Sequence, residues 1–166
     1  MSNFIDKTFT VIADLFLKIF PASRKEKQAF SYYRTGLSDQ SKGRYNSALY
    51  NYFMALELEE DPYDRSFILL NIGIIFKNTG RTKNALEFLH QAISLNESLT
   101  KAYHTIGVIY HSQAGAASTL DNDEETGISE ELFDKAAEYW LQALILEPDS
   151  YPGARNWLKA SGRLIE

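Results

Sequence analysis

The stretch GIIFKNTGRTKNALEFLHQA, residues 73–92, contains a frame of small residues that recurs along the chain. Within it the small residues are Gly73, Gly80, Ala85 and Ala92. Each has a counterpart 37 residues earlier, and these are Gly36, Gly43, Ala48 and Ala55. A third set begins 34 residues after Gly73, at Gly107, and resumes after an insertion of 17 residues, at Ala136 and Ala143. Internal periodicity of this size predicts a solenoid of repeated units.

Small residues at these positions let two antiparallel helices approach closely where their axes cross. Gly43 and Gly80 are placed to make the turns between the helices of the first two pairs. Large side chains are expected to fill the remaining space between helices: Tyr32, Tyr45, Tyr52, Ile72, Phe76, Leu89, Tyr103, Ile106, Tyr110, Phe133 and Trp140. The pattern therefore predicts an all-α protein built from helix–turn–helix units.

This pattern resembles the tetratricopeptide (TPR) repeat from about Glu26 to Pro148. The resemblance implies three repeats within residues 25–150, at about 29–64, 66–99 and 100–150, the third with an insertion at about 112–128. The expected helices cover residues 26–41, 45–59, 62–78 and 82–95, one beginning near 99, and one at 129–147. A capping helix is expected in residues 151–166, with Trp157 and Leu158 buried against the third repeat.

The composition narrows the functional class. The 166 residues suffice for one domain, and 45% apolar residues suffice for a continuous core. The net charge of −5 argues against general attraction to nucleic acid. The chain has no cysteine, which excludes disulfides, thiolate metal sites and cysteine nucleophiles. No apolar run reaches the length needed to span a bilayer.

Residues 1–24 read as an amphipathic helix followed by a short basic hinge. Asn3 can cap the helix, Pro21 ends it, and Asp6 and Asp14 argue against a cleaved import peptide. One face carries the apolar residues Phe4, Ile5, Phe9, Ile12, Phe16 and Ile19. Two interpretations stay open for this helix: it packs on the solenoid, or it binds a membrane surface or a partner.

The insertion in the third repeat is small and polar at first and strongly acidic later. Asp121, Asp123 and Glu125 alternate as in a calcium loop, but the glycine that such a loop needs stands too late, at Gly127. We therefore expect a flexible or partly helical extension here and no calcium site.

No catalytic constellation stands out in the sequence. His104 and His111 share one helix face, but a metal site would need a third ligand that the spacing does not supply. There is neither a phosphate-binding glycine loop nor a nucleophile elbow. The sequence therefore predicts a binding module that is not an enzyme and has no cofactor.

The TPR resemblance implies that the first helix of each repeat lines a partner-binding groove. Carrying the family's positions over gives Phe30, Tyr33, Arg34, Leu37, Phe67, Leu70, Asn71, Ile74, Lys101, His104, Thr105 and Val108. Only Asn71 and Lys101 match the clamp with which some TPR adaptors hold the acidic C-terminus of heat-shock chaperones. An apolar or helical ligand is the expectation, and the alternative is that the chain's own N-terminal helix fills the groove.

Longer motifs are similar to the photosystem I assembly TPR family of plastids and cyanobacteria. They are NFIDKTF at residues 3–9, EKQAFSYYR at 26–34, DPYDRSFILLNIG at 61–73, FDKAAEYW at 133–140 and NWLK at 156–159. The resemblance implies a non-enzymatic assembly factor for newly made photosystem I subunits. It also implies a peripheral position on the thylakoid, on the stromal side in plastids or the cytoplasmic face in cyanobacteria. The expected partners are photosystem I subunits, other assembly factors and the membrane surface, with no nucleic acid and no small-molecule substrate. A general adaptor for a heat-shock chaperone is the alternative.

Overall fold

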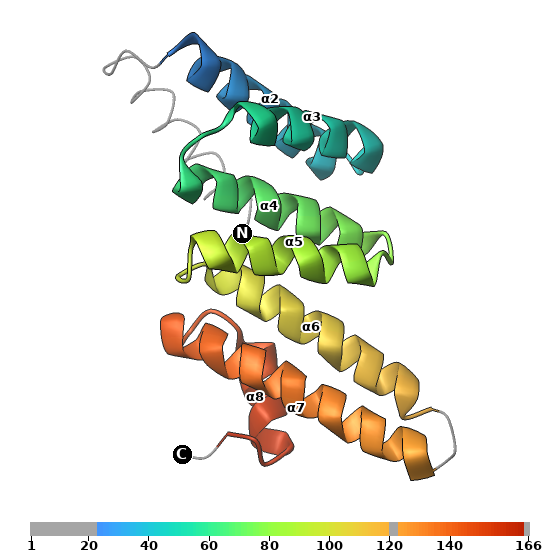
Figure 1. Cartoon of the computed structure of the whole chain (residues 1–166). Helices are drawn as coiled ribbons and strands as arrows, with labels where there is room; N and C mark the ends of the chain where they lie inside the picture. Colours follow the sequence, from blue (N-terminus) through green and yellow to red (C-terminus); the bar gives the residue numbers. More distant parts are fainter. Residues whose placement is uncertain (1–22, 120–122, 165–166) are drawn as a thin grey trace. The chain divides into compact units, whose positions relative to one another are not determined.

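A computed structural model of the chain describes residues 23–119 and 123–164. Within these ranges the protein is all-α, as predicted, with seven helices and no strand. The helices are α2 (Arg24–Ser41), α3 (Tyr45–Leu58), α4 (Pro62–Asn78), α5 (Thr82–Leu95), α6 (Thr100–Ala117), α7 (Asp123–Leu146) and α8 (Pro152–Ala160), as Figure 1 shows. The predicted amphipathic helix, with Phe4, Ile5, Phe9, Ile12, Phe16 and Ile19, lies outside the described residues.

The chain forms two compact units, Met1–Glu60 and Asp61–Glu166. In the first unit α2 packs against α3. In the second unit α4 pairs with α5 and α6 with α7, while α5 also contacts α6 and α8 contacts α7 (Figure 1). The bounds of α4 and α5 coincide with the predicted ones, whereas α7 begins six residues before the predicted start at Ser129.

The sequence marks the first residues of two helices with side-chain caps. At α2, the Glu26 backbone N–H donates to Ser23 Oγ at 3.1 Å and the Ser23 N–H donates to Glu26 Oε2 at 2.8 Å. This reciprocal pair satisfies two amides that the helix itself leaves without partners. At α4, Asp61 Oδ1 accepts the Asp64 N–H at 3.1 Å, and Pro62 occupies the first turn, where no N–H is needed.

Two glycines close the first two helix pairs in the same way. Gly43 has φ +71° and Gly80 has φ +74°, a backbone region that favours glycine. In each turn the residue after the glycine donates its N–H back into the first helix. Arg44 donates to the Asp39 carbonyl and Arg81 to the Phe76 carbonyl, both at 2.9 Å. The two turns therefore share one hydrogen-bonding pattern 37 residues apart.

In each helix pair, a glycine on the first helix leaves room for a large side chain of the second helix to pack against it. A Cβ on Gly36 would lie 2.6 Å from Tyr52 Cε1, and one on Gly73 would lie 2.7 Å from Leu89 Cγ. On Gly107 it would lie 2.5 Å from Trp140 Nε1. Glycine and partner are 16 residues apart in the first two pairs and 33 apart in the third, a difference equal to the 17-residue insertion.

The insertion lengthens the third helix pair at its far end. The last residue of α4, Asn78, corresponds to Ser112, and α6 continues five residues beyond it. The first residue of α5, Thr82, corresponds to Phe133, and α7 begins ten residues before it. Five residues instead of three separate the two helices, which accounts for all 17 inserted residues. The buried Ser129 hydroxyl donates to the Ala114 carbonyl at 3.0 Å, so the two extensions remain paired. The insertion was expected to be flexible or partly helical, and most of it is helical.

The helix α8 completes the second unit. Leu158 is fully buried and Ala154 nearly so, in a cluster with Ala137, Trp140 and Leu144. The Arg163 guanidinium beyond α8 donates to Asp134 Oδ1 at 2.8 Å and to Glu130 Oε2 at 2.6 Å. The predicted burial of Leu158 is confirmed, and Trp157 is half-buried against the same cluster.

Candidate partner-binding surface

The residues predicted to line the groove lie on α2, α4 and α6, the first helices of the three pairs. In the first unit, Phe30, Tyr33 and Leu37 are half-buried on α2 and Arg34 is exposed. The Arg34 guanidinium lies 5.8 Å from the centre of the Phe30 ring. The Tyr33 ring lies 5.8 Å from that of Tyr52, the residue that packs on Gly36. This face of α2 therefore combines aromatic rings with an exposed cation.

A pocket of about 460 Å³ opens on the same helix. It is lined by Lys27, Phe30, Ser31, Arg34, Thr35, Ser38, Asp39 and Arg44. Three of these residues are basic, one is acidic and three carry hydroxyl groups, so the pocket is positively charged on balance. Two of them, Phe30 and Arg34, belong to the predicted groove.

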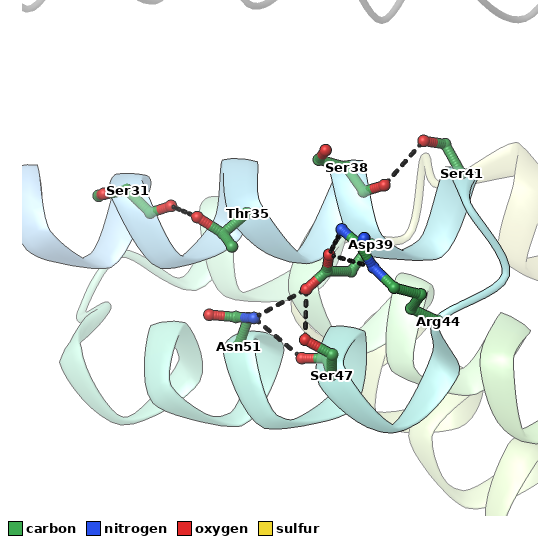
Figure 2. A network of polar contacts seen from close by, with 8 residues as sticks. All are labelled: Ser31, Thr35, Ser38, Asp39, Ser41, Arg44, Ser47 and Asn51. Atoms are coloured by element: carbon green, nitrogen blue, oxygen red, sulfur yellow. Dashed lines mark hydrogen bonds and ion pairs between the residues drawn. The ribbon is translucent and has the colours of Figure 1, made fainter.

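Asp39, which is only 5% exposed, anchors a polar network between α2 and α3 (Figure 2). The Arg44 guanidinium and the Ser47 hydroxyl donate to its carboxylate, and Asn51 Nδ2 donates to Oδ2 at 3.2 Å. Hydrogen bonds from Ser47 and Arg44 outweigh desolvation and lower the pKa of the Asp39 carboxyl below its usual value of 3.8. The sequence analysis did not predict this network. The signal that could have predicted it is the presence of an Asp and an Asn at core positions of the repeat.

In the second unit, the predicted residues of α4 divide into outer and inner positions. Phe67 and Ile74 are half-buried, whereas Leu70 and Asn71 are 4% and 8% exposed. Asn71 Nδ2 donates to the carbonyl of Phe67, one turn earlier, at 3.0 Å. A ligand arriving at this helix from solvent therefore meets Phe67 and Ile74 before it meets the two buried residues.

The predicted residues of α6 are partly covered by the chain's own C-terminal segment. The His104 ring stacks on Tyr151, with centroids 4.0 Å apart and planes at 11°. Val108 packs against the cluster that holds α8, and Thr105 is buried with its hydroxyl donating to the Lys101 carbonyl at 2.6 Å. Lys101 alone of the predicted set on this helix is exposed.

Both histidines of α6 serve in packing. His111 lies 5.1–5.4 Å from the rings of Phe133, Trp140 and Trp157. Burial lowers the pKa of His111, and burial followed by the charge of Lys77 lowers the pKa of His104, so both stay neutral near pH 7. Across residues 23–119 and 123–164, no three His, Asp or Glu side chains gather in a way that could hold a metal ion.

Proteins of similar sequence match the chain from end to end. The photosystem I assembly protein Ycf3 of the diatom Phaeodactylum tricornutum is 66% identical over 166 residues, covering 100% of this chain and 99% of its own. The chain belongs to the Ycf3 family. Ycf3 of the cyanobacterium Rippkaea orientalis is 54% identical and that of Cyanophora paradoxa 53%, each covering 97% of this chain and 91% of its own. No protein-family model matches the chain.

Solved structures agree with the TPR fold predicted for this member of the Ycf3 family. The Arabidopsis OM64 TPR domain superposes with a TM-score of 0.65 at 17% identity, covering 82% of this chain and 98% of that one. The first TPR of Spaghetti (RPAP3), bound to the HSP90 peptide SRMEEVD, gives a TM-score of 0.62 at 20% identity, covering 83% and 93%. At these identities the likeness establishes the helical TPR solenoid and nothing more specific.

None of the described helices α2–α8 is both long and apolar enough to cross a bilayer.

Proposed function

We propose that this chain is a non-enzymatic assembly factor that binds newly made photosystem I subunits through its TPR helices. The observation that carries this proposal is the 66% identity, over essentially the whole of both chains, to a photosystem I assembly protein. The paired helices are in keeping with a scaffold.

The contact surface of each unit lies on its first helices. On α2 it consists of Phe30, Tyr33, Arg34 and Leu37, and in the second unit of Phe67, Ile74 and Lys101. Leu70, Asn71, His104 and Val108 support this surface from below, because they are buried or packed against other side chains. Half-buried aromatic and aliphatic side chains beside cations suit an apolar or helical segment with acidic flanks.

The proposed place of action is the thylakoid surface, as a peripheral protein. This would be the stromal side in a plastid and the cytoplasmic face in a cyanobacterium; relatives from a diatom and a cyanobacterium support either setting. The amphipathic pattern of residues 4–19 would supply the contact with lipid or with a partner. Photosystem I subunits and further assembly factors are the proposed partners, with no cofactor.

The adaptor role for a heat-shock chaperone is less well supported. Of the two residues that match the chaperone clamp, Asn71 is buried and its amide is bonded to the Phe67 carbonyl. Lys101 remains exposed, but one cation gives a weak grip on an acidic peptide. Titration with an acidic chaperone C-terminal peptide tests this alternative, and salt-sensitive micromolar binding would revive it.

The main proposal is tested by affinity purification of the tagged protein from gently solubilised thylakoids. The test variant combines Ile74→Ser with Lys101→Glu, because both side chains reach the surface while Leu70 belongs to the core. The matched control combines Ile145→Ser with Lys83→Glu, the same substitutions at exposed positions of α7 and α5. We expect the wild type and the control to retain photosystem I subunits and the test variant to lose most of them. Recovery of soluble chaperones alone by the wild type would refute the proposal.

A further inference from the structure

The C-terminal segment, residues 151–164, lies on α6 through both histidines of that helix. The Tyr151 ring, at the start of α8, stacks on His104 with centroids 4.0 Å apart and planes at 11°. The Trp157 ring, near the end of α8, lies 5.1 Å from the His111 ring with the planes at 87°. The two histidines are about two helical turns apart on one face of α6, so together they contact both ends of α8.

The repeat does not require histidine at either position. The residues that stand at the two equivalent positions of the earlier first helices are Leu70 and Lys77 in α4, and Tyr33 and Gln40 in α2. Histidine is the side chain whose charge ordinarily changes between pH 5 and 8. Among these equivalent positions it occurs only on α6, the helix that the C-terminal segment covers.

The two imidazoles are surrounded by aromatic rings. His104 lies between Tyr151 and Trp140, whose ring centroid is 6.3 Å away. His111 lies among the rings of Phe133, Trp140 and Trp157. Within residues 23–119 and 123–164, neither imidazole forms an ion pair with a carboxylate.

The three carboxylates that border this contact already accept hydrogen bonds. Asp134 and Glu130 of α7 accept from Arg163, and Glu147 Oε2 accepts the Ser150 hydroxyl at 2.6 Å. Burial, followed by the charge of Glu147, raises the pKa of Tyr151, so this phenol stays neutral. The other charges at the contact are positive: Lys77 of α4 acts on His104, and the Arg163 guanidinium lies 5.4 Å from the Trp157 ring. A proton on either imidazole would therefore have no paired anion.

We propose that the C-terminal segment is a pH-sensitive cover, which leaves α6 when His104 and His111 take up protons. Burial lowers the pKa of both imidazoles, and the charge of Lys77 lowers that of His104 further. The two histidines therefore bind protons more readily once the segment has left, and its docking weakens as pH falls below about 6.5. Each histidine can shift the docking equilibrium by up to about tenfold per pH unit. The rings around His111 partly compensate its charge by cation–π contact, so His104 should contribute more.

The release is local, because α8 depends on this contact while α6 and α7 also have contacts of their own. The nine residues of α8 are too few for a stable helix without packing. The helices α6 and α7 keep the packing of Trp140 on Gly107 and the hydrogen bond from Ser129. Departure of the segment uncovers His104 and Val108, and so extends the surface that α6 offers to a partner. The response to protons itself does not depend on the proposed function.

The test measures backbone hydrogen exchange of the full-length protein by mass spectrometry between about pH 8 and pH 5.5, with rates corrected for their intrinsic pH dependence. Protection of residues 153–164 should fall at least about tenfold on acidification, while that of α4 stays unchanged. In the variant His104→Phe with His111→Phe, which keeps an aromatic ring at both positions, protection should not change with pH. The matched control is His90→Phe, because His90 is the third histidine of the chain and contacts Tyr139 of α7 instead. The control should respond like the wild type.

Wild-type protection of residues 153–164 that is independent of pH would overturn the inference, as would an undiminished fall in the double variant. A simultaneous loss of protection in α4 would indicate global unfolding and also overturn it. If circular dichroism shows that the double variant does not fold, the single variants decide. His104→Phe should then remove more of the fall than His111→Phe, and the full wild-type fall in both would count against the inference. Co-purification of photosystem I subunits near pH 8 is a separate measurement, so the proposed function stands or fails independently of these results.

Discussion

The first two helix pairs share one backbone frame but join their helices by different chemistry. In α2–α3 the carboxylate of Asp39 meets Asn51 Nδ2 at 3.2 Å within a polar network. In α4–α5 the residues 37 positions later are Phe76 and Phe88, whose ring centroids lie 5.4 Å apart. The third pair has Tyr110 and Tyr139 there, 5.7 Å apart. The glycine contacts fix how closely the helices approach, and the residues near the turn are free to be polar or aromatic.

The polar network and the aromatic pair depend on their surroundings in different ways. An aromatic pair gains its stability from buried area and tolerates small shifts in position. A buried carboxylate must keep all its donors, because a partly satisfied network costs more than an apolar core. We therefore expect the first pair to be sensitive to single polar substitutions and to acid, and the second to be sensitive to loss of volume.

Moving the polar network into the second pair is the strongest test of this comparison. Phe76→Asp should destabilise the second unit by about 3–5 kcal/mol, since it removes a buried ring and inserts a carboxylate. Arg81 already stands where Arg44 does, so adding Asn84→Ser and Phe88→Asn should restore at least about 1 kcal/mol. Urea unfolding followed by circular dichroism gives both values. A triple variant less stable than the single one would show that the two chemistries are not interchangeable.

Adding a methyl group at the frame glycines should affect all three pairs alike. Gly36→Ala, Gly73→Ala and Gly107→Ala each push a Cβ into Tyr52, Leu89 or Trp140 and should cost about 1–3 kcal/mol. Gly115→Ala on α6 meets nothing within 4 Å and should stabilise the protein by about 0.5–1 kcal/mol. Thermal melts compare the four variants. A destabilising Gly115→Ala, or a neutral Gly73→Ala, would contradict the role assigned to these contacts.

Acid should weaken the first pair through Asp39. Because the pKa of this carboxyl is lowered in the folded protein, its contribution is complete above the usual value of 3.8 and is lost as pH falls through the folded pKa. Asp39→Asn should therefore lower the melting temperature near pH 7, and the gap to the wild type should shrink below about pH 4. Melts of both proteins across this range, with Asp149→Asn as an exposed control, measure the effect. If the difference in melting temperature between the wild type and Asp39→Asn did not change with pH, the network would not depend on the charge of the Asp39 carboxylate.

The smallest expected effect concerns the arginines that follow the two turns. Arg81 lies 5.5 Å from the centre of the Phe76 ring, so Arg81→Ala should cost about 0.5–1 kcal/mol. Arg44→Ala should cost more than Arg81→Ala, because it removes the cation that faces the buried Asp39. Parallel urea titrations rank the two variants. A larger loss for Arg81→Ala would reverse the order and count against the polar network as the main link between α2 and α3.

The fold followed from the sequence because its determinants are local and repeated. Gly36, Gly73 and Gly107 stand in phase with the large residues they accept, so the helix pairs could be predicted from spacing alone. The cap at Asp61 carries its own sequence signal, and the predicted start of α4 is confirmed. The basic hinge was predicted to extend too far, because Ser23 caps α2, which begins at Arg24, two residues before the predicted start. The start of α7 was placed too late because the acidic residues before Ser129 read as loop, although antiparallel pairing with α6 stabilises them as helix.

The surface was harder to predict because it depends on contacts between distant segments. The positions carried over from the TPR family placed His104 and Val108 on the predicted groove, but they gave no sign that Tyr151 and the α8 cluster would cover them. Nor could the family positions show that Leu70 and Asn71 are buried. The pocket on α2 depends on Arg44 joining residues of the preceding helix across the turn, which no helical period shows.

The aromatic cluster around α8 determines which part of this protein tryptophan fluorescence can monitor. The chain has two tryptophans, Trp140 and Trp157, and their rings lie 5.3 Å apart in that cluster. Intrinsic tryptophan emission therefore senses α6, α7 and α8, and carries no direct signal from α2 or α3. Circular dichroism averages over all the helices, so a urea curve that differs between the two signals would reveal one unit unfolding before the other.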